Sequence, residues 1–344
     1  MSGVDAQLRV AVLVDDEYIE RWQRNALSSL LAEADVTLSH VVVNDRTRRT
    51  AGSGEWATFA RNAVDRIRQY PLWSLVGVAR LLTAEPEYRR PVHIDSLPGA
   101  SEAKQFSCRP RSVSEFWNEL PHETVERLEN VDVVVRFGFG MLKGRILEAP
   151  TYGVLSYHHG DIRRYRGQPS GLWEFLNDEP RMGVTVQRLT DTLDGGEIAA
   201  LETIDISGPT TWQENRTRTY ARAERLLVPA VRSLVGARDT VERPDRLGDL
   251  YRIPRGWDVA RYVVENTSAR LQSGIVRRVS LLASAWGVPG AVGLLFVVGL
   301  LIGGLHPLFT HHYLVPVHLE QIAGFALAVT SAALLSATDR QRAV

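Results

Sequence analysis

Cysteine, lysine and net charge are all scarce in this chain, and each scarcity excludes a class of protein. The 344 residues contain one cysteine, Cys108, so an intramolecular disulfide is excluded. Lysine occurs only at Lys104 and Lys143, so nearly all of the basic charge is arginine. Basic and acidic residues both number 40, which gives a formal net charge of zero. Because a nucleic-acid-binding face usually shows as a basic excess, we expect no nucleic-acid partner.

Charge is missing altogether from a long stretch near the C-terminus, between Arg278 and Glu320. Residues 281–305 form an uncharged run of 25 residues, and as a helix this run exceeds the roughly 30 Å of membrane hydrocarbon. A second run, 321–337, is rich in small residues, which suit helix–helix contact in lipid. The pattern predicts a transmembrane helical hairpin over 281–338. The alternative for the first run is a buried helix of a water-soluble core.

The flanks of these runs predict how the hairpin is oriented. Arginines flank the two runs on their outer sides: Arg270, Arg277, Arg278, Arg340 and Arg342. The intervening loop, 306–318, has no lysine or arginine, so both flanks and the large N-terminal domain are expected in the cytoplasm. We therefore expect a multi-pass membrane protein with two spans and contact with membrane lipid. The loop has histidines but no carboxylate or thiol, and no metal site is predicted.

Short β-branched runs alternate with helical patterns over the first 207 residues, which is typical of an α/β fold with a parallel sheet. The expected strands are 8–14, 36–43, 91–96, 130–136, 153–158, 183–189 and 197–206. The expected helices are 17–34 (capped by Asp15 or Asp16), 112–129, 141–148, 169–177 and 210–234. The predicted domains are the sheet domain 1–207, a helical extension and juxtamembrane linker 208–280, and the hairpin 281–338.

The densest group of chemistry-bearing residues follows the strand 153–158. Ser156 and His158 are two residues apart, so their side chains share one face of that strand. Asp194 lies in a turn after the strand 183–189, and ligands gather at the carboxyl ends of parallel strands. A histidine beside a carboxylate can exchange a proton near neutral pH, which acyl transfer to an amine requires. Spacing alone leaves a purely structural role open, because histidine pairs and Asp-Gly turns also occur by chance.

Three segments together are similar to the formyltransferase family: RFGFGML, SYHHG and MGVTVQRLTDTLDGGEIA, within residues 131–206. Members of that family include glycinamide ribonucleotide, methionyl-tRNA and amino-sugar formyltransferases, and formyltetrahydrofolate hydrolases share the fold. The resemblance implies a Rossmann-like α/β sheet domain. It also implies 10-formyltetrahydrofolate as the formyl donor, with no metal.

The resemblance assigns catalytic roles to the histidine cluster. His158 matches the family histidine and is expected to be the acid and base. Asp194 matches the family aspartate, which orients and charges that histidine. The family asparagine, whose amide donates to the formyl oxygen, is replaced here by Ser156. A hydroxyl can donate one hydrogen bond, so Ser156 with the adjacent His159 is expected to stabilise the oxyanion.

The resemblance also implies residues that bind the substrates. The folate-binding residues, through backbone contacts to the pterin edge, would be Phe139, Gly140, Met141, Leu142 and Asp191. A packed strand-to-helix turn is the alternative for that loop. Arg164 and Arg166 would hold a phosphate of the acceptor or the glutamate tail of folate, unless they form a solvated basic loop.

Three functions follow from these expectations. The first is a membrane-anchored formyltransferase that moves a formyl group from 10-formyltetrahydrofolate to a primary amine, such as an amino sugar. The second is a formyl or acyl hydrolase of the same fold. The third is a catalytically inactive membrane-tethered binding module, with turnover lost through Ser156.

Overall fold

The computed structural model describes residues 7–45, 64–81, 85–114, 116–236 and 241–270. The chain divides into two compact units, Met1–Thr267 and Ser268–Val344. The strands are β1 (Leu8–Val14), β2 (Tyr18–Glu20), β3 (Val36–Asn44), β4 (Pro91–His93), β5 (Lys104–Cys108), β6 (Arg111–Ser112), β7 (Trp117–Glu119), β8 (Val133–Arg136), β9 (Met141–Leu142), β10 (Val154–His158), β11 (Tyr165–Gly167), β12 (Arg181–Arg188), β13 (Glu197–Asp205) and β14 (Asp249–Tyr251). The helices are α1 (Arg21–Leu31), α3 (Pro71–Leu81), α4 (His122–Leu128), α5 (Leu172–Leu176), α6 (Trp212–Gly236) and α7 (Trp257–Arg270), with short 3₁₀ turns η1 (Glu87–Arg89), η2 (Ile94–Ser96) and η3 (Arg145–Leu147).

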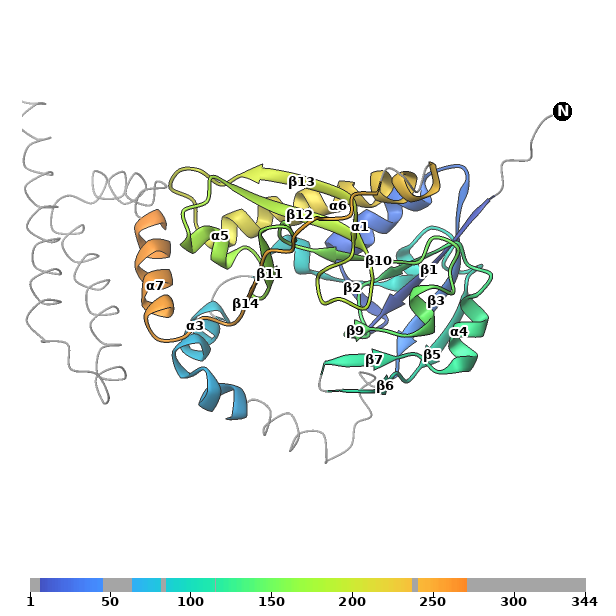
Figure 1. Cartoon of the computed structure of the whole chain (residues 1–344), viewed down its shortest axis with the longest axis horizontal. Helices are drawn as coiled ribbons and strands as arrows, with labels where there is room; N and C mark the ends of the chain where they lie inside the picture. Colours follow the sequence, from blue (N-terminus) through green and yellow to red (C-terminus); the bar gives the residue numbers. More distant parts are fainter. Residues whose placement is uncertain (1–6, 46–63, 82–84, 115, 237–240, 271–344) are drawn as a thin grey trace, which may run out of the picture. The chain divides into compact units, whose positions relative to one another are not determined.

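A seven-stranded mixed sheet forms the centre of the first unit, in the order β13-β12-β10-β8-β1-β3-β5 (Figure 1). The five strands from β10 to β5 are parallel, and β12 and β13 add to them in antiparallel fashion. The parallel β1–α1–β3 start expected from the sequence is confirmed. The chain therefore has a Rossmann-like α/β sheet fold.

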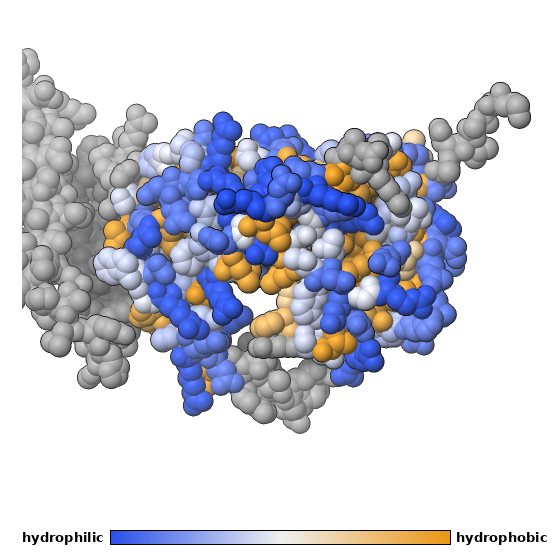
Figure 2. Space-filling view, in the orientation of Figure 1, coloured by the Kyte–Doolittle hydropathy of each residue, from blue (hydrophilic) through white to orange (hydrophobic). Residues whose placement is uncertain are grey.

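Helices cover both faces of this sheet, which explains why β1 is apolar along almost its whole length. Val10 and Val12 point to the face covered by α1 and α6, whereas Ala11 and Leu13 point to the α4 face. All four are fully buried, as expected for a central strand of a parallel sheet. Figure 2 shows a mixed displayed face, with hydrophobic patches near its centre among hydrophilic residues.

Three of the expected helices are corrected by the structure. The helix expected over 17–34 begins only at Arg21, because Tyr18–Glu20 pairs with β4. The Glu20 backbone N–H donates to the Gln23 side chain at 2.9 Å, so neither Asp15 nor Asp16 is the cap. The helix expected over 112–129 is reduced to α4, which starts after Pro121, since the preceding residues form the β6–β7 hairpin.

The helix expected over 141–148 is also wrong. Met141–Leu142 pairs with β7 instead, and only the 3₁₀ turn Arg145–Leu147 follows it. Helical spacing in such a short apolar segment does not distinguish a helix from a paired strand.

The segment after residue 207 contributes directly to the sheet unit. Helix α6 packs on β12 and β13, and β14 pairs with β11 in parallel. Both lie within the region that the sequence interpretation assigned to a helical extension and juxtamembrane linker, 208–280, and the first compact unit runs to Thr267. The two predicted spans, 281–305 and 321–337, lie outside the described residues. Among the residues that the structure does describe, no helix is both long and apolar enough to cross a bilayer.

Candidate active site

Three polar side chains form a row across neighbouring strands at the end of the central sheet. Ser156 on β10 pairs with Arg136 at the end of β8 on one side and with Gln187 of β12 on the other. His158 lies two residues beyond Ser156 and ends β10, so it shares their face of the sheet. This is the face that α4 covers lower down, where Val134 and Val154 are buried. The sequence prediction that Ser156 and His158 share one face is confirmed.

His158 lies between a carboxylate and a backbone carbonyl. Its Nδ1 is 3.5 Å from Asp194 Oδ1, and its Nε2 donates to the Tyr165 carbonyl at 3.0 Å. Burial alone would lower the pKa of His158, but the Asp194 carboxylate and the carbonyl outweigh it, so the pKa is raised. Burial raises the pKa of Asp194, but His158, the Gly167 N–H and the charge of Arg136 together outweigh burial, so the pKa is lowered. The pair therefore favours an imidazolium facing a carboxylate.

Backbone contacts hold the turn that carries Asp194. Asp194 has a φ of +44°, and its Oδ2 accepts from the Gly167 N–H at 3.1 Å. The Gln187 side chain accepts from the Gly196 N–H at 2.9 Å, and Arg166 donates to the Leu193 carbonyl at 3.0 Å. The Asp-Gly-Gly turn is thus fixed from both β11 and β12, which brings Asp194 to His158 across 36 residues of chain.

The Ser156 hydroxyl oxygen accepts hydrogen bonds from Arg136, a residue that the sequence interpretation missed. The Ser156 Oγ accepts from Arg136 Nη2 at 2.8 Å and from Nε at 3.2 Å. Arg136 Nη1 donates to the Gly140 carbonyl. Burial lowers the pKa of Arg136, while the negative charges of Asp194 and Asp15 oppose that effect. The available signal was the charged residue that closes the apolar run of β8 (Val133–Arg136), in register with the site.

His159 lies with a different group of residues from His158. Its ring centroid is 4.0 Å from that of Tyr220 and 5.1 Å from that of Trp22, which places it in the aromatic cluster under α1 and α6. Burial lowers the pKa of His159 to about 3, so the ring is neutral. Successive residues of a strand face opposite sides, and His159 follows this alternation. Its predicted role beside Ser156 stays a prediction, and the ring's placement gives that role no geometric support.

Glu174 is a second carboxyl near His158, and the sequence interpretation also missed it. It lies on α5, only 3% of it is exposed, and its Oε1 has no hydrogen-bond partner among the described residues. Burial raises the pKa of Glu174 to about 7. Glu174 was visible in the sequence as the one charged residue of the apolar segment Leu172–Leu176.

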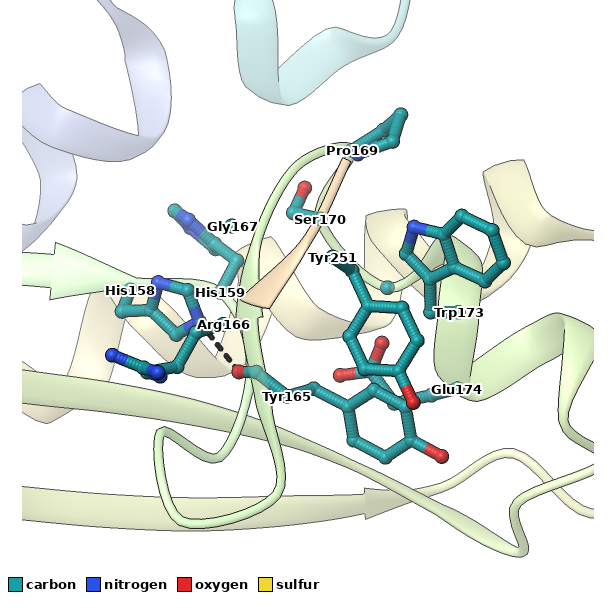
Figure 3. Close-up of a pocket in the computed structure, with 11 residues that line it drawn as sticks. His158, His159, Tyr165, Arg166, Gly167, Pro169, Ser170, Trp173, Glu174 and Tyr251 are labelled. Carbon is teal, nitrogen blue, oxygen red and sulfur yellow. Dashed lines mark hydrogen bonds between the residues drawn. The ribbon is translucent and has the colours of Figure 1, made fainter. Parts of the chain in front are cut away.

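A small pocket lies beside these groups. Figure 3 shows His158 on one side of it and the rings of Tyr165, Tyr251 and Trp173 on the other, around Glu174. Tyr251 stacks on Tyr165 at 5.1 Å and contacts Trp173 at 5.0 Å between ring centroids. Because Tyr251 belongs to β14, a segment distant in sequence completes this wall.

In the turn expected to bind folate, backbone groups already form hydrogen bonds with other residues of the protein. The Phe139 N–H donates to Asp15 at 2.7 Å, and its carbonyl accepts from Asn118 at 2.8 Å. Phe139 and Leu142 are buried in the core, and Met141 and Leu142 form β9. Asp191 is exposed. The folate-binding role of Phe139, Gly140, Met141, Leu142 and Asp191 remains a prediction.

The two arginines predicted to bind substrate have partners within the protein. Arg164 forms an ion pair with Glu179 at 2.7 Å, and Tyr165 donates to the same carboxylate. Arg166 donates to the Gly248 carbonyl at 2.7 Å in addition to Leu193, so it connects β14 to the Asp194 turn. In the described part of the chain no cluster of side chains could hold a metal ion.

Residues 89–231 match the family described as formyl transferase. The chain is 25% identical over 162 residues to a methionyl-tRNA formyltransferase of Rickettsia prowazekii, covering 46% of this chain and 52% of that protein. It is 26% identical over 106 residues to the Agathobacter rectalis methionyl-tRNA formyltransferase, covering 30% and 34%. The chain thus spans about a third to a half of these relatives.

The backbone is also similar to those of several solved structures. One is glycinamide ribonucleotide transformylase 1 from Symbiobacterium toebii, at 17% identity and a TM-score of 0.42, covering 72% of this chain and 96% of that one. Another is the Helicobacter canadensis N-formyltransferase in complex with folinic acid and dTDP-3-aminofucose, at 11% identity and a TM-score of 0.45, covering 76% and 80%.

Proposed function

We propose, from the match of residues 89–231 to the formyl transferase family, that this chain moves a formyl group from 10-formyltetrahydrofolate to a primary amine. The observation that carries the proposal is the pairing of His158 with Asp194, 3.5 Å apart at the carboxyl end of β10. The proposed acceptor is an amino sugar, presented near a membrane by the anchor predicted over 281–338.

The pairing suits the proton transfers that amide exchange requires. Attack of the amine nitrogen on the formyl carbon creates an oxyanion and a positively charged nitrogen, and the departing nitrogen must gain a proton. The raised pKa of His158 favours the doubly protonated ring, whose Nε2–H donates to the Tyr165 carbonyl in this structure and exchanges that partner for the departing nitrogen when it acts as the acid. After donating, the neutral ring can take the proton that the attacking amine loses. Asp194 stabilises the imidazolium each time it forms.

The test is a formyl transfer assay of the full chain with 10-formyltetrahydrofolate and a panel of primary amines that includes dTDP-3-aminofucose. We expect a formamide product that depends on the amine, and a loss of product in His158→Ala. Release of formate without any amine would instead support the hydrolase. No turnover with any amine, together with unchanged folate-analogue binding in His158→Ala, would overturn the proposal and favour an inactive binding module.

A further inference from the structure

Arg136 is a cation that lacks a carboxylate partner yet lies in the site. Among the described residues, no carboxylate forms an ion pair with it, and its hydrogen bonds go only to Ser156 and the Gly140 carbonyl. The residue is partly buried, and Asp194 and Asp15 offset the cost of burying its charge without forming an ion pair with it. A site that keeps such a charge is suited to a negative group that arrives with the substrate or forms during the reaction.

The guanidinium also retains unused donors. A guanidinium carries five N–H groups in a planar fork. Ser156 takes one from Nε and one from Nη2, and Gly140 takes one from Nη1. One N–H on each of the two terminal nitrogens is left without a partner in the described structure. The Ser156 oxygen, accepting from two positions of one fork, fixes the plane in which those free N–H groups lie.

We propose that Arg136 is the catalytic residue that binds the oxyanion in this chain, and that Ser156 is the positioning residue that holds its guanidinium. This inference rests on the proposed function. It explains why the chain can have a serine at position 156, where the resemblance to the family leads one to expect an asparagine whose amide donates to the oxyanion. Serine is shorter than asparagine, so it leaves room for the guanidinium from the neighbouring strand and offers it an acceptor.

The step balances without any further reagent. The amine lone pair forms a bond to the formyl carbon, and the π electrons of the C=O bond move onto oxygen, which becomes the oxyanion. Arg136 donates its free N–H groups to that oxygen, and charge-assisted hydrogen bonds of this kind are the strong ones. The C=O bond then re-forms, the bond from carbon to the donor nitrogen breaks, and that nitrogen leaves with the proton supplied by His158. Arg136 neither gains nor loses a proton.

The experiment compares Arg136→Met with the wild-type full chain in the formyl transfer assay with dTDP-3-aminofucose. Removing one oxyanion donor costs roughly 10²–10³-fold in kcat, and we expect a loss of that size with little change in KM for the donor. Added guanidinium ion should restore part of the rate in Arg136→Ala, where the smaller side chain leaves room for the ion. The melting temperature of Arg136→Met should stay equal or rise, because an unpaired cation is replaced by an apolar chain of similar length.

A double variant tests the assigned partnership. Ser156→Asn alone should be slow, because the larger amide competes with the guanidinium for space. Combined with Arg136→Ala, the new amide can reach the oxyanion, so the double variant should be faster than either single one. The control is Arg222→Ala on α6, an arginine with half of its side chain exposed that pairs with Glu202 at 3.5 Å.

Binding of formate, whose carboxylate resembles the oxyanion, gives a readout that needs no turnover. In calorimetry of the full chain, Arg136→Met should weaken formate binding tenfold or more, and Arg222→Ala should not. If the wild type transfers formyl groups and Arg136→Met keeps kcat within threefold, the role of Arg136 is overturned and the proposed function stands. If no amine is formylated but formate binding depends on Arg136, the proposed function falls and the anion site stands. If neither holds, both fall.

Discussion

A histidine with hydrogen-bond acceptors at both ring nitrogens is biased toward its doubly protonated form. His158 is held by the carboxylate of Asp194 and the carbonyl of Tyr165, which together favour the doubly protonated ring. Such a ring is ready to donate a proton and must lose one before it can act as a base. The chemistry of the site therefore depends on how strongly Asp194 stabilises the imidazolium.

Replacing Asp194 with asparagine should separate that charge effect from the packing. We expect Asp194→Asn to lower kcat by about 10²–10⁴-fold, the usual size of an acid–base contribution. The pKa of His158, raised above 6.5 in the native protein, should fall, because burial then acts without the opposing carboxylate. The stability that the raised pKa contributes is fully present below pH 6.5 and is lost as the pH rises through the folded-state value. An NMR titration of the imidazole measures the shift, and an unchanged pKa would exclude Asp194 as its cause.

Glu174 should make the protein less stable as the pH rises. The buried carboxyl has a pKa of about 7, against 4.5 when it is exposed, so the folded state binds its proton more tightly than the unfolded state does. Stability is therefore full below pH 4.5 and falls as the pH rises through 7. Glu174→Gln should remove the fall, gaining about 3 kcal/mol over the wild type at pH 8 and little at pH 4.5. Urea unfolding at both pH values measures this difference, with the exposed Glu126→Gln as control. Equal gains at the two pH values would contradict it.

At the scale of elements, the site depends on a strand that lies outside the matched family segment. β14 pairs with β11, and β11 carries both the Tyr165 carbonyl and the Gly167 N–H that hold His158 and Asp194. Gly248, just before β14, lies so close to β11 that an added Cβ would be 2.1 Å from the Arg164 carbonyl carbon. The site geometry therefore requires glycine there.

Gly248→Ala should displace β14 and loosen the Asp194 turn. We expect a loss of at least tenfold in kcat with the central sheet intact, since that sheet does not include β11 or β14. Circular dichroism and the turnover assay measure the two effects. Gly236→Ala is the matched control, because a Cβ at that position meets nothing within 4 Å. A Gly248→Ala protein with wild-type kcat would show that β14 does not support the site.

The parts of this arrangement that the sequence predicts are those set by strand periodicity. The period of two places Ser156 and His158 on one face, and the β-branched runs locate the central strands within one to three residues. Contacts between distant segments have no such local signal. The Ser156–Arg136 contact depends on the register of β8 against β10, and the wall built by Tyr251 depends on the return of the chain 86 residues after Tyr165. Helix ends were misplaced where short strand pairings, such as β2 with β4, competed with helical spacing.

For the whole molecule, the predicted hairpin makes association with lipid testable. An uncharged run of 25 residues at 281–305 is long enough to cross the hydrocarbon layer as a helix. The full chain should float with phosphatidylcholine vesicles in a sucrose gradient and resist extraction by high salt, whereas a fragment of residues 1–270 should stay at the bottom. Equal behaviour of the two proteins would count against a membrane anchor.

The fragment of residues 1–270 should also keep the activity that a shorter fragment loses. A chain ending at Gly236 lacks β14 and α7, and with them Tyr262, which is 7% exposed and packs on the buried ring of Trp212. Asn266 of α7 accepts from the Trp212 N–H at 3.2 Å, so removing the helix also leaves the start of α6 without that partner. Burial of each large apolar side chain contributes about 1.5–3 kcal/mol, and several would be exposed at once.

Residues 1–236 should therefore melt at a lower temperature than residues 1–270 and lose formyl transfer, because β11 loses its pairing strand beside His158. Equal melting temperatures and rates would show that the segment from 241 to 270 is dispensable to both the fold and the site.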